Sequence, residues 1–356
     1  MRMIFKVKTL PLLLQRFALV SATFLLIFST ANAQIVKSEI DTFTVAFYNV
    51  ENLFDTINDP AISDTEFLPE AEKQWTEKRY HKKLSNLAKV IAAIPSPELP
   101  DLVGLCEVEN KMVVLDLTKQ QEISNAGYQI VHNDSPDRRG IDVALLYKPG
   151  HFSVLKHQSF TAPLVTSGNP TRDVLYVTGV ARKTDTLHIF VNHWPSRYGG
   201  VEKSAPNRNA IAKLVRTKID SLQQADPATK IVVMGDFNDN PDDASVEEIL
   251  GGATIPEETE KPLYNLHSAA YSRGEGTFNY KGTWSMLDQI LVSWSLRDSA
   301  TGLHCPADAG GILREPWMIY TSKKGVEYPN KTYGGPSYYG GYSDHLPVYA
   351  TFQYIY

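Results

Sequence analysis

The feature that most constrains the fold is a buried strand that ends in polar residues, Ile231-Val232-Val233-Met234-Gly235-Asp236-Phe237-Asn238-Asp239. Four apolar residues in a row predict a short strand in the interior of a sheet. Gly235 ends this run, and Asp236 and Asn238 follow two residues apart, so in extended chain both side chains point to the same side. Such a strand end can present two oxygen ligands, or a base and its orienting group, to one pocket.

Acidic, amide or histidine residues also lie at the ends of other predicted strands. The segments are Tyr48-Asn49-Val50-Glu51, Leu105-Cys106-Glu107, Asn192-His193-Trp194, Leu287-Asp288-Gln289 and Ser343-Asp344-His345. A carboxylate after an apolar run is costly to bury unless it is paired or bound to a metal, which favours Glu107 over Glu109. Asn49 alone would read as a turn amide. His193 follows an apolar run, with Asn192 and Arg197 nearby, which favours a functional role over a structural one.

The first 33 residues differ from the rest of the chain. They carry four basic residues and no acidic one, and the apolar run 17–28 precedes the small-residue pattern Ala31-Asn32-Ala33. This pattern is typical of a cleaved signal peptide. The alternative is a membrane anchor, but the apolar run is short for a span. We therefore expect a signal peptide over 1–33, a single domain over 34–356 with no membrane span, and an exported protein, either periplasmic or secreted.

The charge of the mature chain bears on its partners. The full chain carries a formal net charge of −5, and loss of residues 1–33 removes four basic residues and no acidic one, leaving −9. A protein that binds nucleic acid through a basic surface would have the opposite balance. An acidic protein can still cut a phosphodiester when its carboxylates surround a metal ion. Nothing in the sequence indicates a stable protein partner, and Cys106 and Cys305 could be paired or free.

The remaining pattern predicts alternating strands and helices. We expect strands over about 43–48, 102–108, 143–147, 174–182, 187–191, 277–284, 288–293 and 347–353, and helices over about 76–94, 112–126, 209–224 and 246–250. These ranges follow the periodicity of apolar residues and the turn residues between them.

Four further residues are candidates for contacts to the substrate: Arg139, Asp142, Arg197 and Arg208. Arg139 and Asp142 could contact a phosphate and a catalytic partner, or could form a charge pair on a surface hairpin. Arg208 comes at the predicted start of a helix, where an anion is favoured.

A glycine-rich segment, 333–342, carries four tyrosines directly before Ser343. We expect it to be a flexible loop. Its aromatic rings could stack on bases or sugars, or could pack over the edge of the sheet.

The candidate set is rich in oxygen donors and poor in histidine and cysteine. It comprises Asn49, Glu51, Glu107, His193, Asp236, Asn238, Asp288, Asp344 and His345. Hard cations prefer oxygen ligands, so Mg²⁺ fits best, with Mn²⁺ or Ca²⁺ as alternatives. A zinc site would want more histidine or cysteine.

These segments, in this order, resemble the endonuclease/exonuclease/phosphatase family, which includes deoxyribonuclease I. The most specific motifs are Gly235-Asp236-Phe237-Asn238-Asp239 and Ser343-Asp344-His345-Leu346-Pro347-Val348, with Leu287-Asp288-Gln289 between them. The resemblance covers about residues 43–352, and the segment 192–197 is similar to a secreted bacterial branch of the family. It implies a four-layered α/β sandwich, with two mixed β-sheets packed face to face and helices outside.

The resemblance also implies roles. Glu107 corresponds to the principal metal ligand, with Asn49 and Glu51 beside it and Asp344 near the metal. Asp236 and Asn238 correspond to the pair that orients or deprotonates the water and holds the phosphate. His345, oriented by Asp288, corresponds to the catalytic histidine, and His193 to a second histidine that contacts the phosphate or acts as the acid. The number of metal ions and the partner that orients His193 stay open.

Together these features favour a secreted, divalent-metal-dependent phosphodiester hydrolase, foremost an endonuclease with extracellular nucleic acid as its substrate. The alternative is a phosphatase or phosphodiesterase that acts on phospholipids or sugar phosphates. A third reading, a binding protein on a degenerate scaffold, is disfavoured because Glu107, Asp236, Asn238, Asp288 and His345 are all present.

Overall fold

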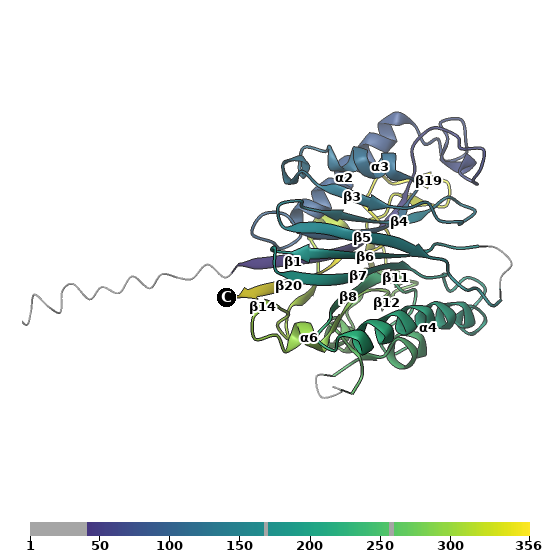
Figure 1. The fold of residues 1–356 in the computed structure, drawn as a ribbon. Coiled ribbons are helices and arrows are strands. Elements are labelled where there is room, and N and C mark those ends of the chain that lie inside the picture. Colours follow the sequence, from purple (N-terminus) through teal and green to yellow (C-terminus); the bar gives the residue numbers. More distant parts are fainter. Residues whose placement is uncertain (1–40, 167–169, 256–259) are drawn as a thin grey trace, which may run out of the picture. The chain divides into compact units, whose positions relative to one another are not determined.

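Two seven-stranded mixed sheets form the centre of the molecule in a computed structural model that describes residues 41–166, 170–255 and 260–356. The predicted signal peptide, residues 1–33, lies outside the described residues. Figure 1 shows the two sheets with helices on their outer sides.

The first sheet has the strand order β14-β20-β1-β2-β4-β3, and β15 also pairs with β20. Strand β1 is central, parallel to β2 and antiparallel to β20. The strands are β1 (Thr42–Leu53), β2 (Leu102–Val108), β3 (Gln129–His132), β4 (Asp142–Tyr147), β14 (Gly302–His304), β15 (Gly310–Ile312) and β20 (Val348–Ile355).

The second sheet has the order β5-β6-β7-β8-β13-β10-β9. Strands β7 and β8 are parallel, and β13 runs antiparallel to β8. The strands are β5 (Phe152–Phe160), β6 (Val174–Ala181), β7 (Asp185–His193), β8 (Lys230–Asp236), β9 (Gly252–Ala253), β10 (Leu263–Asn265) and β13 (Asp288–Ser293).

Alternation along the central strands creates three apolar layers. In β1, Phe43, Val45 and Phe47 face the second sheet, whereas Ala46, Tyr48 and Val50 face the opposite way. That outer face is covered by α2 (Glu77–Ala93) and α3 (Lys111–Thr118). In β8, Val232 and Met234 face the first sheet, while Ile231 and Val233 face α4 (Val201–Ala225). Side chains of a strand point alternately to its two faces, so each strand contributes to two layers. The four-layered α/β sandwich is confirmed.

Several predicted boundaries are wrong. Helix α4 begins at Val201 rather than near 209, because Pro206 lies in its second turn and does not break it. The helix expected over 112–126 ends at Thr118, and a separate 3₁₀ turn, Ser124–Ala126, ends at Gly127 with a φ of 60°. The strand expected over 277–284 is a hairpin of β11 (Phe278–Tyr280) and β12 (Thr283–Ser285). Strands β3 and β5 were not predicted.

The remaining elements are short. They are α5 (Ser268–Ser272), α6 (Trp294–Arg297), the π-helical turn Ser245–Leu250, the 3₁₀ turns Thr65–Phe67 and Pro316–Met318, and the hairpins β16–β17 (Ile319–Thr321, Glu327–Pro329) and β18–β19 (Tyr333–Gly334, Ser337–Tyr338). Within the described ranges, no helix has the length and apolarity to cross a membrane. Cys106 and Cys305 are both buried and free, so they do not form a disulfide.

Candidate active site

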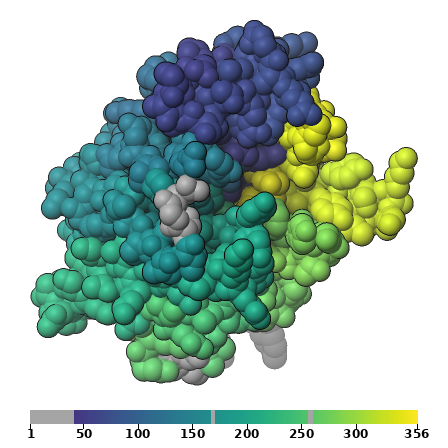
Figure 2. All heavy atoms as spheres, turned by 90° about the vertical axis from the view of Figure 1, so that its right-hand side faces the viewer, coloured from purple at the N-terminus to yellow at the C-terminus, as the bar shows by residue number. Residues whose placement is uncertain are grey.

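Six strands bring the predicted residues to one end of the sandwich. Strands β1, β2, β7 and β8 end there, and β13 and β20 begin there because they run antiparallel to β8 and β1. The Cα of Asp236 is paired with His193 on one side and with Asp288 on the other. Figure 2 faces the right-hand side of Figure 1, and segments from the beginning, middle and end of the chain meet near its centre.

Glu107 lies at a β-bulge. The register of β2 shifts at Glu107 against both neighbouring strands, β1 and β4. The φ of Glu107 is 62°, which lies in the left-handed region. A bulge turns a side chain away from its regular alternation, and such backbone strain is concentrated at functional sites. Glu107 Oε2 accepts a hydrogen bond of 2.9 Å from the Asn52 amide, and Oε1 lies 3.4 Å from Asn49 Nδ2. The bulge therefore directs Glu107 toward the residues at the end of β1.

Asp236 is the centre of the cluster. Its Oδ2 accepts a hydrogen bond of 3.0 Å from Asn49 Nδ2, and its Oδ1 accepts one of 2.9 Å from the Asn238 amide. The Nε2 atoms of His193 and His345 lie 3.7 Å and 3.9 Å from Asp236 Oδ2. Burial raises the pKa of Asp236, while His345 acts against that rise. One carboxylate is therefore shared between two imidazole rings.

His345 is oriented by Asp288. Its Nδ1 lies 2.7 Å from Asp288 Oδ2, which leaves Nε2 on the side of Asp236. The ring also packs on Phe278 of the β11–β12 hairpin, with centroids 4.9 Å apart. Burial favours the neutral ring, but Asp288 and then Asp236 outweigh it and raise the pKa of His345 well above its ordinary value. The Asp288–His345 pair expected from the family resemblance is thus present.

His193 has a different environment. Its Nε2 lies 3.8 Å from Glu107 Oε1, and its buried Nδ1 has no hydrogen-bond partner within the described ranges. Burial lowers the pKa of His193 well below its ordinary value, and Arg172, Arg139 and His345 add to the effect. No protein group among the described residues fixes the tautomer of His193. The sequence likewise indicated no partner that orients this ring.

The structure gives Asn49 and Glu51 other contacts than those of metal ligands. Asn49 presents its amide nitrogen to Glu107 and Asp236, and its oxygen accepts the Glu51 N–H at 3.0 Å. The Glu51 carboxylate accepts hydrogen bonds of 2.6 Å and 3.1 Å from the amides of Thr332 and Tyr333. In this arrangement Asn49 orients two carboxylates and Glu51 anchors a loop, and ligation of a metal by either residue stays a prediction.

Asp344 and Asn238 flank the cluster. Burial raises the pKa of the partly buried Asp344, with Glu51 adding to the rise. Asn238 has a φ of 51° and donates from Nδ2 to the Trp194 carbonyl at 3.0 Å. The second predicted member of the Asp-x-Asn pair is thus tied to the His193 loop.

Two predicted substrate contacts have structural partners instead. Arg208 lies inside α4 rather than at its start, is fully buried, and donates from Nε to Asp239 Oδ2 at 2.6 Å. Asp142 accepts hydrogen bonds from Ser135 and lies 2.9 Å from His132 Nε2. Neither residue is available to a ligand in this arrangement, because the groups that would bind it are already engaged.

The two other predicted contacts lie nearer the cluster. Arg197 donates to the Asn238 carbonyl at 2.7 Å and to Asp243 at 2.6 Å, so it braces the loop after β8. Arg139 is exposed and lies close enough to His193 to act on its pKa. Of the four predicted contacts, Arg139 alone combines exposure with an electrostatic effect on the cluster.

Sequence reasoning missed Arg172. This residue precedes β6, is 8% exposed, and donates to Asp137 at 3.1 Å and to the Trp194 carbonyl at 2.8 Å. Its Nε is buried without a partner among the described residues, and its charge acts on His193. The sequence did contain a sign of a role for Arg172, because Arg172-Asp173 stands directly before a strand that was predicted from Val174.

The cluster suits a hard divalent cation. The carboxylates of Glu107, Asp236 and Asp344 are concentrated here, and sulfur is represented only by the buried Cys106. Asp236, Asp288 and His345 also form a group whose potential ligand atoms lie within 4.8 Å of one another. Crowded carboxylates are stabilised by bound Mg²⁺, Mn²⁺ or Ca²⁺, which prefer oxygen donors. The donor set therefore fits a metal of this class.

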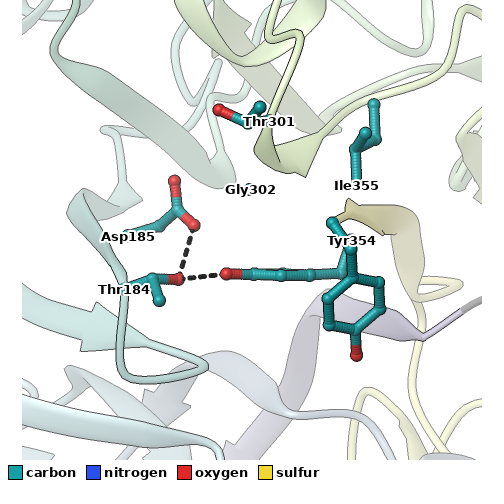
Figure 3. A pocket seen from close by; sticks show the side chains of 7 residues that line it. Thr184, Asp185, Thr301, Gly302, Tyr354 and Ile355 are labelled. Carbon is teal, nitrogen blue, oxygen red and sulfur yellow. Dashed lines mark hydrogen bonds between the residues drawn. The ribbon is translucent and has the colours of Figure 1, made fainter.

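Two cavities lie elsewhere. One of about 390 Å³ is lined by Thr184, Asp185, Thr301, Gly302 and the segment 354–356, as Figure 3 shows, and a second of about 460 Å³ shares Thr184 and Asp185. Asp185 begins strand β7, whereas His193 ends it. Both cavities are thus at the opposite end of the strands, away from the convergent acidic and histidine side chains.

Comparison with known proteins agrees with this geometry. Residues 44–354 match the model of the endonuclease/exonuclease/phosphatase family. No curated protein sequence matches the chain.

Solved structures show the same fold. A family protein from Bacteroides thetaiotaomicron is 17% identical, with a TM-score of 0.53 over 89% of this chain and 100% of its own. A mannosyl-6-phosphatase from the same species is 18% identical, with a TM-score of 0.52 over 88% and 100%. TDP2 of D. rerio, solved with a single-strand DNA product, is 15% identical, with a TM-score of 0.52 over 88% and 99%.

Proposed function

This chain belongs to the endonuclease/exonuclease/phosphatase family, and from that premise we propose that it is a divalent-metal-dependent phosphodiester hydrolase that cuts nucleic acid as an endonuclease. The observation that carries the proposal is the position of Asp236. It lies between two histidines, 3.7 Å and 3.9 Å from their Nε2 atoms, beside a carboxylate on a bulge. This combination provides a base, a phosphate contact and a cation ligand at one point.

The metal would be held by Glu107 and Asp344, with Mg²⁺ as the first choice. When bound, it supplies positive charge that offsets the charge on the nonbridging oxygens and on the leaving group. Asn49 would hold Glu107 and Asp236 in place through its amide nitrogen, since that nitrogen lies within 3.4 Å of both carboxylates.

The chain's own groups would handle the proton. Asp288 holds Nδ1 of His345 and leaves Nε2 on the side of Asp236, where the neutral ring can accept a proton from the attacking water. Because the pKa of His345 is raised, this neutral form is favoured toward alkaline pH. A positioned base of this kind contributes about 10²–10⁴-fold to the rate. His193, with Nε2 3.8 Å from Glu107, would contact a phosphate oxygen, and Asn238 would orient the water together with Asp236.

Nucleic acid is the proposed substrate, and the protein is proposed to be exported after cleavage of residues 1–33, with 34–356 as one domain. The signal pattern of the first 33 residues supports export. The structural neighbour TDP2, which was solved with a single-strand DNA product, supports a nucleic-acid substrate as an analogy of fold. The acidic charge argues against tight binding of long duplexes, not against cleavage.

A phosphatase acting on sugar phosphates is the second candidate. One structural neighbour is a mannosyl-6-phosphatase that covers 88% of this chain. The same cluster could serve that reaction, because hydrolysis of a monoester uses the same cation and activated water.

The test is hydrolysis by the chain from Gln34 onward, purified and loaded with Mg²⁺. We expect nicking of supercoiled DNA that EDTA abolishes and that added Mg²⁺ restores. Release of inorganic phosphate from a hexose phosphate without any nicking would replace the nuclease with the second candidate. No hydrolysis of either substrate would contradict the proposal.

A further inference from the structure

The loop before the catalytic motif, Asn330–Tyr342, is firmly held, contrary to the expected flexibility. We call it the tyrosine loop. Its start is anchored by Glu51, which accepts the N–H groups of Thr332 and Tyr333 at 2.6 Å and 3.1 Å. Glycines allow close packing here, since a Cβ at Gly341 would lie 2.1 Å from the Asn330 carbonyl oxygen. Glycine thus gives this loop compactness rather than mobility.

Helix α2 holds the same loop from its other side. Lys83 is buried and donates from Nζ to Thr332 Oγ1 at 2.6 Å and to the Tyr342 carbonyl at 2.7 Å. Asn86, three residues later on the same helix face, donates to the Gly340 and Gly341 carbonyls at 3.0 Å and 2.7 Å. Both ends of the loop are therefore fixed to one rigid element.

Three of the four tyrosines are used in packing. Tyr333 lies 5.8 Å from Trp75 between ring centroids, Tyr338 lies under the Arg79 guanidinium at 4.4 Å, and Tyr342 lies 4.8 Å from Trp317. These three rings pack against other side chains of the protein rather than facing a ligand. They stabilise the loop.

Tyr339 differs from the other three, because its side chain is 62% exposed. Its ring rests against Gly334: a Cβ at that glycine would lie 2.5 Å from the ring atom Cε2 and 2.5 Å from the hydroxyl oxygen of Tyr339. One side of the ring is thus supported by the β18–β19 hairpin while most of its surface is open. An aromatic ring fixed in this way loses little conformational entropy when a ligand covers it.

A cation lies in the neighbouring segment of the loop. Lys331 directly precedes Thr332, whose carbonyl accepts the Tyr339 N–H at 2.8 Å and whose own N–H donates to Glu51 at 2.6 Å. The charge of Lys331 also acts on Asp344. Across residues 41–166, 170–255 and 260–356, no salt bridge involves Lys331. The loop therefore presents an open aromatic ring and an unpaired ammonium beside the catalytic motif.

We propose that Tyr339 and Lys331 form a subsite for the nucleotide next to the scissile phosphate, in which the base stacks on Tyr339 and the flanking phosphate meets Lys331. Stacking on an aromatic side chain suits single-stranded nucleic acid of any sequence, because every base has a flat face. The subsite rests on the proposed function and adds a preference for unpaired, base-bearing strands.

The experiment compares two fluorescent 10-mers of equal charge, oligo-dT and an abasic strand of tetrahydrofuran units. Binding is measured by fluorescence anisotropy in EDTA, and cleavage is measured in Mg²⁺. Wild type should prefer oligo-dT by about tenfold in both, within the range of one stacked base. Tyr339→Ala should lose the preference and keep its behaviour toward the abasic strand, whereas Tyr339→Phe should retain the preference.

Tyr320→Ala is the matched control, because Tyr320 is 55% exposed on the separate β16–β17 hairpin. This variant should behave as wild type. Lys331→Gln should reduce the slope of log affinity against log salt by about 0.7, the contribution of one single-strand phosphate contact.

The two proposals fail separately. Equal binding of both strands by wild type, or an unchanged preference in Tyr339→Ala, overturns the subsite. If neither strand is cleaved but Tyr339→Ala still abolishes the preference in binding, the subsite stands and the hydrolase assignment fails.

Discussion

The two ends of strand β7 show how differently this sandwich uses its charged residues. At the start of the strand, Asp185 forms a salt bridge with Lys230 and accepts a hydrogen bond of 3.2 Å from the Leu303 amide. At its end, His193 lies within 3.8 Å of two carboxylates, Glu107 and Asp236. The first end pairs opposite charges, whereas the second concentrates acids and histidines.

The two ends of β7 differ in which of them borders the cavities and in which of them carries clustered acidic and histidine side chains. The start of β7 borders both cavities, of about 390 Å³ and 460 Å³, yet the carboxylate there is already paired with Lys230. Backbone conformation shows the same contrast. Positive φ values at the first end fall in the turn Arg182–Lys183, but at the second they fall on Glu107 and Asn238. The proposed reaction site therefore rests on backbone strain and crowded carboxylates rather than on cavity volume.

The strongest test of this comparison is to remove one functional group from the end of β7 at His193, where the acidic and histidine side chains converge. We call this end the convergent end. His345→Ala should lower kcat about 10²–10⁴-fold, the effect of losing a positioned base. Glu107→Gln should have an effect of similar size, because it removes a proposed ligand of the proposed catalytic cation. The measurement is the rate of plasmid nicking at saturating Mg²⁺. Near-normal rates in both variants would show that the convergent end is not the active site.

A second test sharpens the distinction between Glu107 and Glu51. Glu107→Gln should weaken Mn²⁺ binding about tenfold or more, because it removes a proposed ligand. Glu51→Gln should leave Mn²⁺ affinity nearly unchanged but lower Tm, since the buried Lys83 loses its anionic neighbour 3.8 Å away. Isothermal titration calorimetry and thermal unfolding measure the two effects. Equal losses of affinity in both variants would show that Glu51 is a ligand as well.

The sequence predicted elements better than side-chain directions. The bounds of β2 and β13 were predicted correctly, because each is an apolar run with a polar residue at its end. Convergence of these ends could be inferred from the family resemblance. The contacts of Glu51 could not, because its partners Thr332 and Tyr333 are about 280 positions away and a bulge sets its direction.

The position of Arg208 was predicted wrongly for a similar reason. Arg208 was expected at the start of a helix, but the helix begins at Val201 and buries this residue against Asp239. A pattern of neighbouring residues does not show which carboxylate or turn a side chain will contact in the folded protein. Such contacts depend on tertiary packing, which single-sequence patterns do not contain.

A third prediction concerns the opposite end. Asp185→Asn should leave the nicking rate unchanged while lowering the free energy of unfolding by about 1–3 kcal/mol, because Lys230 is left nearly buried without its counter-charge. Chemical denaturation and the nicking assay measure the two quantities on the same protein. A large loss of activity at unchanged metal affinity would mean that the two ends are coupled.

The smallest effect expected concerns pH. Because the folded-state pKa of His345 is raised, its pair with Asp288 stabilises the protein fully below the unfolded pKa of about 6.5. That contribution is lost as pH rises through the folded pKa. The stability difference between wild type and Asp288→Asn, measured in EDTA, should thus be largest near pH 6 and shrink toward alkaline pH. A difference that grows with pH would contradict the ion pair.

The most direct test of the central claim is to locate the cation. Crystals of the mature chain soaked in Mn²⁺ should give their strongest anomalous peak in contact with the Glu107 carboxylate, at the convergent end of the strands. Glu107→Gln crystals should lose that peak. A peak beside Asp185, or no peak near Glu107, would contradict the assignment of the reaction to this end of the sandwich.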